Sequence, residues 1–172
     1  MQKSERAQRI KQAAYLEGDF VLSSGRRSKY YLDKYLFTTR PELLGAVARL
    51  AAELLPGDTA RIAGAELGAV PLAAAVSLHT RLPFVIVKKQ AKDYGTSKPI
   101  EGVLQAGDKV ALVEDIITTA GQCIKAANAL KDAGAQVIKV IGIIDRQEGG
   151  ADNIRDAGFE YEPLFVKADL GI

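Results

Sequence analysis

The stretch "VALVEDIITTAGQ", residues 110–122, decides the fold and the chemistry expected of this chain. Its first half is aliphatic, which is typical of a buried strand, and two adjacent acids, Glu114 and Asp115, close it. Small and hydroxyl-bearing residues follow, and a helix is predicted to begin at Gly121. Ligands of open parallel sheets bind where the strands end, so we expect a binding site at this junction.

The junction offers two kinds of contact. Backbone N–H groups over 118–122, together with the positive end of the following helix dipole, would form a cradle for a phosphate. The carboxylates of Glu114 and Asp115 accept hydrogen bonds and suit hydroxyl groups. The alternative is an ordinary strand-to-helix turn with solvated acids. Two acids beside an anion cradle favour a ligand that carries both hydroxyls and phosphate.

The rest of the chain alternates between short aliphatic runs and helical patterns. Strands are predicted at 61–65, 84–88, 110–114, 137–145 and in the tail at 159–166, with helices near 70–79 and over 121–133. Aliphatic runs without strict alternation suit strands that are covered on both faces, and intervening helices suit parallel connections. We therefore expect a three-layer α/β fold, with a central, mostly parallel sheet flanked by helices.

A smaller unit precedes this core. Residues 4–16 have helical spacing, and two apolar runs, 20–22 and 30–32, flank a turn and predict an antiparallel hairpin. A further helix is predicted from Pro41 to Leu55. We expect one domain over 1–172, in which 1–40 form a hood of a helix and a hairpin and 41–172 form the α/β core.

The stretch "KKQAKDYGTSKPIE", residues 88–101, interrupts the pattern with four lysines and little apolar content. It predicts a long, flexible loop. A solvated lysine-rich surface is the commoner role of such a segment, but long loops in compact domains are often functional.

Composition narrows the class of protein. The chain has 172 residues, of which 48% are hydrophobic and 26% charged, as in an ordinary globular domain. The net charge of +2 gives little reason to expect nucleic acid or an anionic membrane as a partner. A polar start, a single cysteine and the lack of a long apolar run predict a cytoplasmic protein without a membrane segment. His79 and Cys123 are expected to be a surface residue and a packing residue.

Four segments carry a resemblance to a known family. "VALVEDIITTAGQ" resembles the phosphoribosyl pyrophosphate signature of type I phosphoribosyltransferases. "FVLSSGRRSKYYLDK" (20–34) is similar to the hood of the orotate phosphoribosyltransferases, "VKKQAKDYGTSKPIEG" (87–102) to their catalytic loop, and "DRQEGG" (145–150) to the segment after a core strand. Residues from about Gly18 to Gly171 follow the order of motifs in that family.

The resemblance implies transfer of phosphoribose from phosphoribosyl pyrophosphate to orotate, which yields orotidine 5'-monophosphate and pyrophosphate in pyrimidine biosynthesis. It implies a Mg²⁺ ion held mainly by the donor substrate and water, with no direct protein ligand. It also implies a homodimer in which loop lysines are shared between subunits. A purine phosphoribosyltransferase and a non-catalytic regulator that senses the donor and binds RNA remain as alternatives.

Individual roles follow from the same resemblance. Glu114, Asp115 and Lys89 are the catalytic residues, with Lys89 as the main catalytic cation. The implied donor-binding residues are Lys88, Lys89, Lys92, Tyr94, Glu114, Asp115, Ile116, Ile117, Thr118, Thr119, Ala120, Gly121 and Gln122. The implied orotate-binding residues are Ser23, Tyr31, Leu32, Thr118 and Arg146. From the residues alone, Arg146 could instead form a surface ion pair with Asp145 or Glu148.

Some positions depart from the family pattern. Ser23 stands where some members have a lysine, Lys88 where an arginine is usual, and Tyr94 where a histidine is common. "AELG", residues 65–68, replaces a Tyr-Lys pair that part of the family carries. These departures leave open which side chains bind the pyrophosphate and the base.

Overall fold

A computed structural model of the chain describes residues 3–22, 25–89 and 98–172. Its centre is a six-stranded sheet with the order β5-β4-β3-β6-β7-β8. The strands are β3 (Arg61–Ala65), β4 (Phe84–Val87), β5 (Ile100–Glu101), β6 (Lys109–Ile117), β7 (Gln136–Asp145) and β8 (Tyr161–Val166). All neighbouring strands are parallel except the edge strand β5, which is antiparallel to β4. The predicted, mostly parallel sheet is thereby confirmed.

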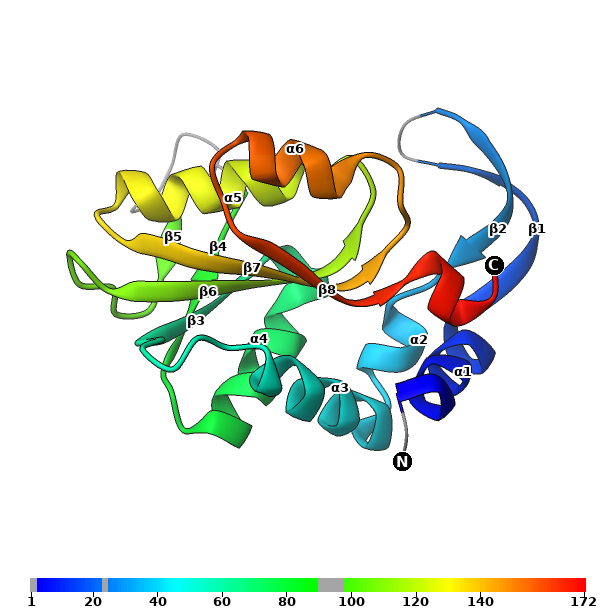
Figure 1. Ribbon diagram of the computed structural model, residues 1–172, viewed down its shortest axis with the longest axis horizontal. Helices are drawn as coiled ribbons and strands as arrows, with labels where there is room; N and C mark the ends of the chain where they lie inside the picture. Colours follow the sequence, from blue (N-terminus) through cyan, green and yellow to red (C-terminus); the bar gives the residue numbers. More distant parts are fainter. Residues whose placement is uncertain (1–2, 23–24, 90–97) are drawn as a thin grey trace.

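Helices cover both faces of this sheet (Figure 1). The helices α5 (Gly121–Asp132) and α6 (Gly150–Asp156) lie on one face, and α3 (Pro41–Glu53) and α4 (Glu66–Thr80) lie on the other. Two hydrophobic clusters fill the spaces between the layers, one with Ile62 and Ile141 at its centre and one with Leu112 and Leu130. The predicted three-layer α/β architecture is confirmed.

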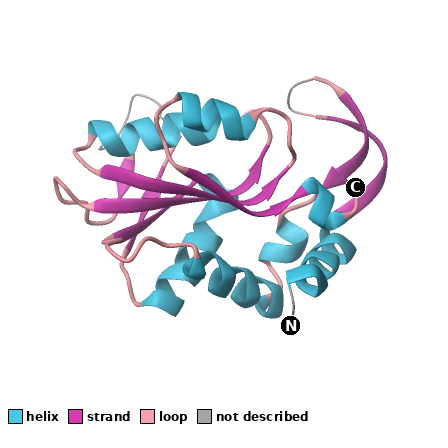
Figure 2. Ribbon diagram, in the orientation of Figure 1, coloured by secondary structure: helices cyan, strands magenta, loops and turns pink. Residues whose placement is uncertain are grey.

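The N-terminal elements lie beside the sheet rather than within it (Figure 2). They are α1 (Lys3–Ala14), the antiparallel hairpin of β1 (Tyr15–Val21) and β2 (Arg27–Leu32), and the short helix α2 (Tyr35–Thr38). The helix α1 packs against a 3₁₀ turn, η1 (Lys167–Leu170), and the Lys11 ammonium donates to the Gly171 carbonyl at 3.0 Å. The last described residues therefore hold the hood helix in place.

Two predicted ends of secondary-structure elements are wrong because the strands pair over more residues than the local sequence predicts. The first helix ends at Ala14, not at residue 16, because Tyr15 and Leu16 pair with β2. The strand predicted to close at Glu114 continues to Ile117, because Glu114 and Ile116 still pair with β7. The two acids therefore lie within β6, as its sixth and seventh residues, and not in the turn that follows it.

The helix predicted near 70–79 is longer and begins at Glu66, directly after β3. It approaches β3 closely because Gly64 has no side chain: a Cβ there would lie 2.8 Å from the Cβ of Ala73 and 2.9 Å from the Ala69 carbonyl oxygen. Glu66 itself has φ 59, in the left-handed region that non-glycine residues rarely adopt. This tight turn places the "AELG" stretch at the carboxyl ends of the strands, next to the end of β6.

Candidate active site

Asp115 is a buried carboxylate at the carboxyl end of β6, with 4% of its surface exposed. The Ile116 N–H donates to its Oδ1 at 2.5 Å, and the Lys34 ammonium lies 2.8 Å from its Oδ2. Gly68, in the first turn of α4, faces the same oxygen, and a Cβ at that position would overlap it. The carboxylate thus occupies a space that only a glycine at position 68 leaves open.

Glu114 has a different environment. Its Oε1 accepts a hydrogen bond from the Asp115 N–H at 3.2 Å. Burial, and then the neighbouring negative charge of Asp115, raise the pKa of Glu114 to about 8. Glu114 therefore retains its proton for much of the time near neutral pH, whereas the Lys34 ammonium lies against the neighbouring Asp115.

The raised pKa of Glu114 predicts that the stability of the protein depends on pH. The protonated form stabilises the fold fully below pH 4.5, the ordinary pKa of the group, and this contribution is lost as the pH rises towards about 8. We expect the free energy of unfolding to fall by roughly 2–4 kcal/mol over this range. In Glu114→Gln, whose amide does not titrate, this fall should be absent.

Urea unfolding at several pH values would measure the effect. Glu53→Gln, a change at an exposed site on α3, serves as the matched control and should keep the pH dependence of the parent protein. Parallel stability curves for Glu114→Gln and the parent would contradict the assignment of the titration to Glu114.

The turn after β6 is the segment for which the sequence predicts an anion cradle. Residues 118–120 connect β6 to α5, and no side-chain hydrogen bond caps the helix at its N-cap residue, Ala120. Ala120 has φ 67 and ψ 13, a left-handed conformation that is strained for a residue with a Cβ. The uncapped N–H groups at the start of this 12-residue helix, together with the helix dipole, suit an anion.

Arg146 lies next to this turn, directly after β7. Its N–H donates to the Ile117 carbonyl at 2.9 Å, which ties the ends of β6 and β7 together. Its side chain is buried, and its Nε lies 2.9 Å from Glu148 Oε1. The guanidinium carbon lies 4.9 Å from the centre of the Tyr30 ring, which belongs to the hood strand β2. Arg146 therefore lies between the core and the hood.

Glu148 binds a second arginine from the hood. Arg26 Nη2 donates to Glu148 Oε2 at 2.6 Å, so one carboxylate bridges two guanidinium groups. Of the two ion-pair partners that the sequence left open for Arg146, the structure shows Glu148. The Asp145 carboxylate instead accepts from the Tyr161 hydroxyl at 3.0 Å and from the Gln147 N–H at 2.7 Å.

The structure brings some of the predicted residues together and separates others. Glu114, Asp115, the 116–122 segment and Arg146 share the carboxyl edge of β6 and β7. Two predicted residues lie in the hood instead. Leu32 is buried in a hydrophobic cluster, and the centre of the Tyr31 ring lies 5.6 Å from the centre of the Phe20 ring.

The lysine-rich segment is described only at its ends. The Lys88 ammonium donates to Glu101 at 2.5 Å, and the Lys89 N–H donates to the Glu66 carboxylate. Three predicted site residues, Ser23, Lys92 and Tyr94, lie outside the described part of the chain.

Sequence reasoning missed two residues at this site, Lys34 and Gly68. It also missed that Glu148 binds a second arginine, Arg26, besides Arg146. Lys34 follows a strand as an ordinary exposed lysine would, and no local pattern relates it to Asp115. Gly68 lies inside a helix, where a glycine usually has no special meaning. Only the three-dimensional packing reveals the contacts of these two residues.

The chain is similar to known proteins over most of its length. A model of the phosphoribosyl transferase domain matches residues 37–161. The orotate phosphoribosyltransferase of Methanocella arvoryzae is 43% identical over 168 residues, which cover 97% of this chain and 96% of that protein. The chain belongs to the orotate phosphoribosyltransferase family. Members of this family are pentosyltransferases, and the orotate phosphoribosyltransferase of Pyrococcus horikoshii is 47% identical over 156 residues, or 89% of this chain and 84% of that protein.

Solved structures of orotate phosphoribosyltransferases have the same fold. The enzyme of Mycobacterium tuberculosis H37Rv, in complex with 5-phospho-alpha-D-ribosyl 1-diphosphate, superposes with a TM-score of 0.82 at 30% identity. The superposition covers 99% of each chain, so both the core and the hood elements of this orotate phosphoribosyltransferase family member have counterparts there.

Proposed function

We propose that this chain transfers the 5-phosphoribosyl group from phosphoribosyl pyrophosphate to orotate, and so forms orotidine 5'-monophosphate and pyrophosphate in pyrimidine biosynthesis. One observation carries the proposal: the acids of β6 and the uncapped N-terminus of α5 lie beside a buried arginine at the end of β7. The donor needs acceptors for its diol and donors for its phosphate, and orotate needs a cation for its carboxylate. The site supplies all three.

For the donor, we assign Glu114 and Asp115 to the ribose hydroxyls and residues 118–122 to the 5-phosphate, with Ile116 and Ile117 as further donor-binding residues. Lys88, Lys89, Lys92 and Tyr94 are assigned to the pyrophosphate, as the family resemblance implies. Substitution at the anomeric carbon passes through a cationic sugar and a departing anion, so cations near the leaving group and carboxylates near the sugar both favour it.

For orotate, we assign the carboxylate to Arg146 and the base to Ser23, Tyr31 and Leu32, with Thr118 between the two substrates. The guanidinium of Arg146 is a planar fork that matches a carboxylate. Its guanidinium carbon lies 4.9 Å from the centre of the Tyr30 ring, a cation–π contact that would favour one orientation of the fork before the substrate binds. The hood would then cover the base and exclude water, which competes with orotate as the acceptor.

We expect Mg²⁺ to bind at this site together with the donor. Among the described residues, no group of three or more His, Cys, Asp or Glu side chains could hold a metal ion. Mg²⁺ binds readily to substrate phosphates and keeps several waters, so the donor and water would hold the ion here without a direct protein ligand. When bound, the ion would neutralise charge on the departing pyrophosphate.

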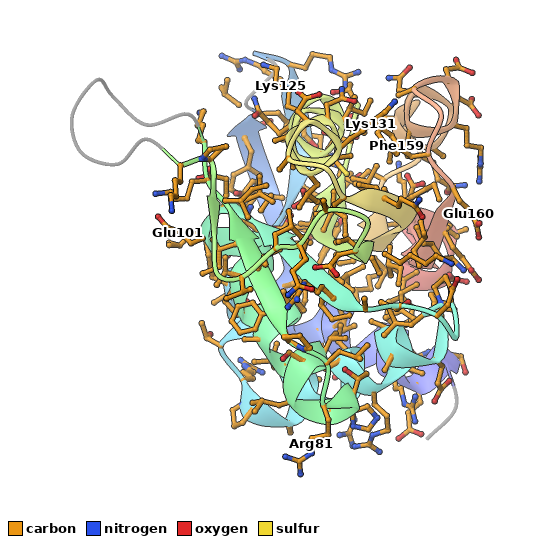
Figure 3. All side chains as sticks on the ribbon, turned by 90° about the vertical axis from the view of Figure 1, so that its left-hand side faces the viewer. Arg81, Glu101, Lys125, Lys131, Phe159 and Glu160 are labelled. Atoms are coloured by element: carbon orange, nitrogen blue, oxygen red, sulfur yellow. The ribbon has the colours of Figure 1, made fainter. Side chains whose placement is uncertain are left out.

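Further assignments concern assembly and location. We propose a homodimer whose loop lysines reach the neighbouring subunit's site, and a single cytoplasmic domain over 1–172 with a hood over 1–40. None of the helices in the described part of the chain has the length and apolar character that crossing a bilayer requires. Lys125 and Lys131 lie on α5, and Arg81 lies at the opposite surface (Figure 3). The net charge of +2 offers little support for RNA as a partner.

An absorbance assay would test the proposed function. With donor and Mg²⁺ present, we expect turnover of orotate and none of uracil, adenine or hypoxanthine, because only orotate carries the carboxylate that Arg146 would bind. Consumption of adenine or hypoxanthine would favour the purine alternative. Donor binding without turnover of any base would favour the regulatory one.

A further inference from the structure

The Lys34 ammonium lies at the proposed diol site. Lys34 is the N-cap residue of α2 and follows the hood hairpin directly. Its Nζ lies 2.8 Å from Asp115 Oδ2, and its side chain is 31% exposed whereas that of Asp115 is 5% exposed. A residue that links hood and core thus places a positive charge on the acid that we assign to the ribose.

Three segments of the chain meet at this ammonium. A Cβ added to Gly68 would lie 2.7 Å from Lys34 Nζ and would overlap the Asp115 carboxylate. The start of α4, the end of β6 and the start of α2 therefore converge on one point. The "AELG" stretch carries no cation of its own, and Lys34 brings one against its backbone.

Asp115 needs such a counter-charge in the unliganded protein. A buried carboxylate without a cation is unfavourable, and here the Oδ1 atom accepts from a backbone N–H while Oδ2 faces Lys34. Burial disfavours the charged ammonium of Lys34, but the hydrogen bond and the charge of Asp115 outweigh it and raise the pKa of Lys34. The ammonium is therefore charged at every physiological pH.

Donor binding must change this contact, provided that the proposed function assigns Asp115 correctly. A ribose hydroxyl that donates to Oδ2 competes with the ammonium for that oxygen. The pyrophosphate is attached to the same sugar ring, at the carbon next to the diol, and carries more negative charge than one carboxylate. The flexible four-carbon stem of a lysine can move its charge over a few ångströms, so an exchange needs no movement of the backbone.

We propose that Lys34 is a donor-binding residue that exchanges partners: its ammonium neutralises Asp115 in the free protein and contacts the pyrophosphate when the ribose diol occupies Asp115 Oδ2. Lys88 is less suited to this position, because its ammonium is held by Glu101 at the edge strand β5. Lys34 thus supplies the positive charge that the "AELG" turn lacks.

Calorimetric titration of three ligands with the full chain would test the exchange. The ligands are phosphoribosyl pyrophosphate, pyrophosphate and ribose 5-phosphate, each with Mg²⁺. In Lys34→Met, which keeps the length of the side chain without its charge, we expect at least about tenfold weaker binding of phosphoribosyl pyrophosphate. Binding of pyrophosphate should change little, because it brings no diol that displaces the ammonium from Asp115. Binding of ribose 5-phosphate should stay unchanged or tighten, because no ammonium has to leave Asp115. Lys34→Arg should restore most of the affinity for phosphoribosyl pyrophosphate.

The matched control is Lys109→Met, which removes another ammonium paired with an acid, Asp58, at the opposite end of β6. It should leave the affinity for all three ligands unchanged. Equal weakening of all three ligands in Lys34→Met would show a purely structural role, and no weakening would show that no contact forms; either result overturns the inference. Failure of the parent protein to bind the donor would instead refute the proposed function. If Lys34→Met does not fold, Lys34→Gln tests the same charge.

Discussion

Replacing Lys89 by alanine is expected to lower turnover about 100- to 1,000-fold while weakening donor binding less than about tenfold. Lys89 is the second residue of the lysine-rich segment, and its N–H donates to the Glu66 carboxylate at the turn between β3 and α4. That contact places the start of the segment beside the end of β6. Negative charge on the pyrophosphate grows as its bond to the sugar breaks, so a cation aimed at it stabilises the transition state more than the bound donor.

Steady-state kinetics with both substrates, together with direct titration of the donor, would separate the two effects. Lys125→Ala, at an exposed site on α5 (Figure 3), is the matched control and should retain full activity. Lys89→Arg should recover part of the lost turnover. Turnover equal to that of the parent would reject the catalytic role, and a loss confined to the donor's KM would make Lys89 a ground-state contact only.

Replacing Arg146 by alanine is expected to raise the KM for orotate about 100-fold and to change the KM for the donor by no more than about threefold. The buried guanidinium is the cation that we assign to the orotate carboxylate, and a charged hydrogen-bonded pair in a desolvated site is costly to lose. Removing it also releases Glu148 and the Tyr30 ring, so part of any loss could arise from the hood.

Glu148→Gln separates these contributions. It removes the carboxylate that bridges Arg146 and Arg26 but keeps both guanidinium groups. If Glu148 occupies Arg146 in place of a substrate carboxylate, the KM for orotate should stay the same or fall in this variant. Steady-state titration of each substrate at a saturating level of the other is the measurement. Equal increases for orotate and donor in Arg146→Ala would argue against the assignment.

The local sequence was sufficient to predict where an element begins or ends when a nearby residue, such as a proline, sets that limit. The strand predicted at 61–65 was confirmed to the residue, and the helix from Pro41 begins where proline sets its first turn but ends two residues early, at Glu53. The end of β6 was missed because charged residues normally close a buried strand, whereas here the backbone pairing with β7 continues past Glu114. Pairing between distant segments, which the local sequence does not contain, decided that boundary.

The site likewise combines features that the local sequence predicts with features that depend on contacts between distant segments. The cradle before α5 and the expectation that His79 is exposed and Cys123 buried depend on local sequence, and the structure confirms the two environments. Burial raises the pKa of the Cys123 thiol, in keeping with a packing residue. The ion pair of Lys34 with Asp115 and the two arginines on Glu148 join segments from the hood and the core. No motif carries that information, because each partner has an ordinary local sequence.

The contact of α1 with η1 has a consequence for how the protein is made. The hood helix leaves the ribosome before any strand of the sheet, yet the turn on which it packs, Lys167–Leu170, is translated after β8. The sheet can assemble strand by strand during translation, and α1 can pack early against α2 and α3, but its contact with η1 has to wait until β8 has been made. The hood helix is therefore synthesised before the sheet, but its contact with η1 can form only after β8 and η1 have been made.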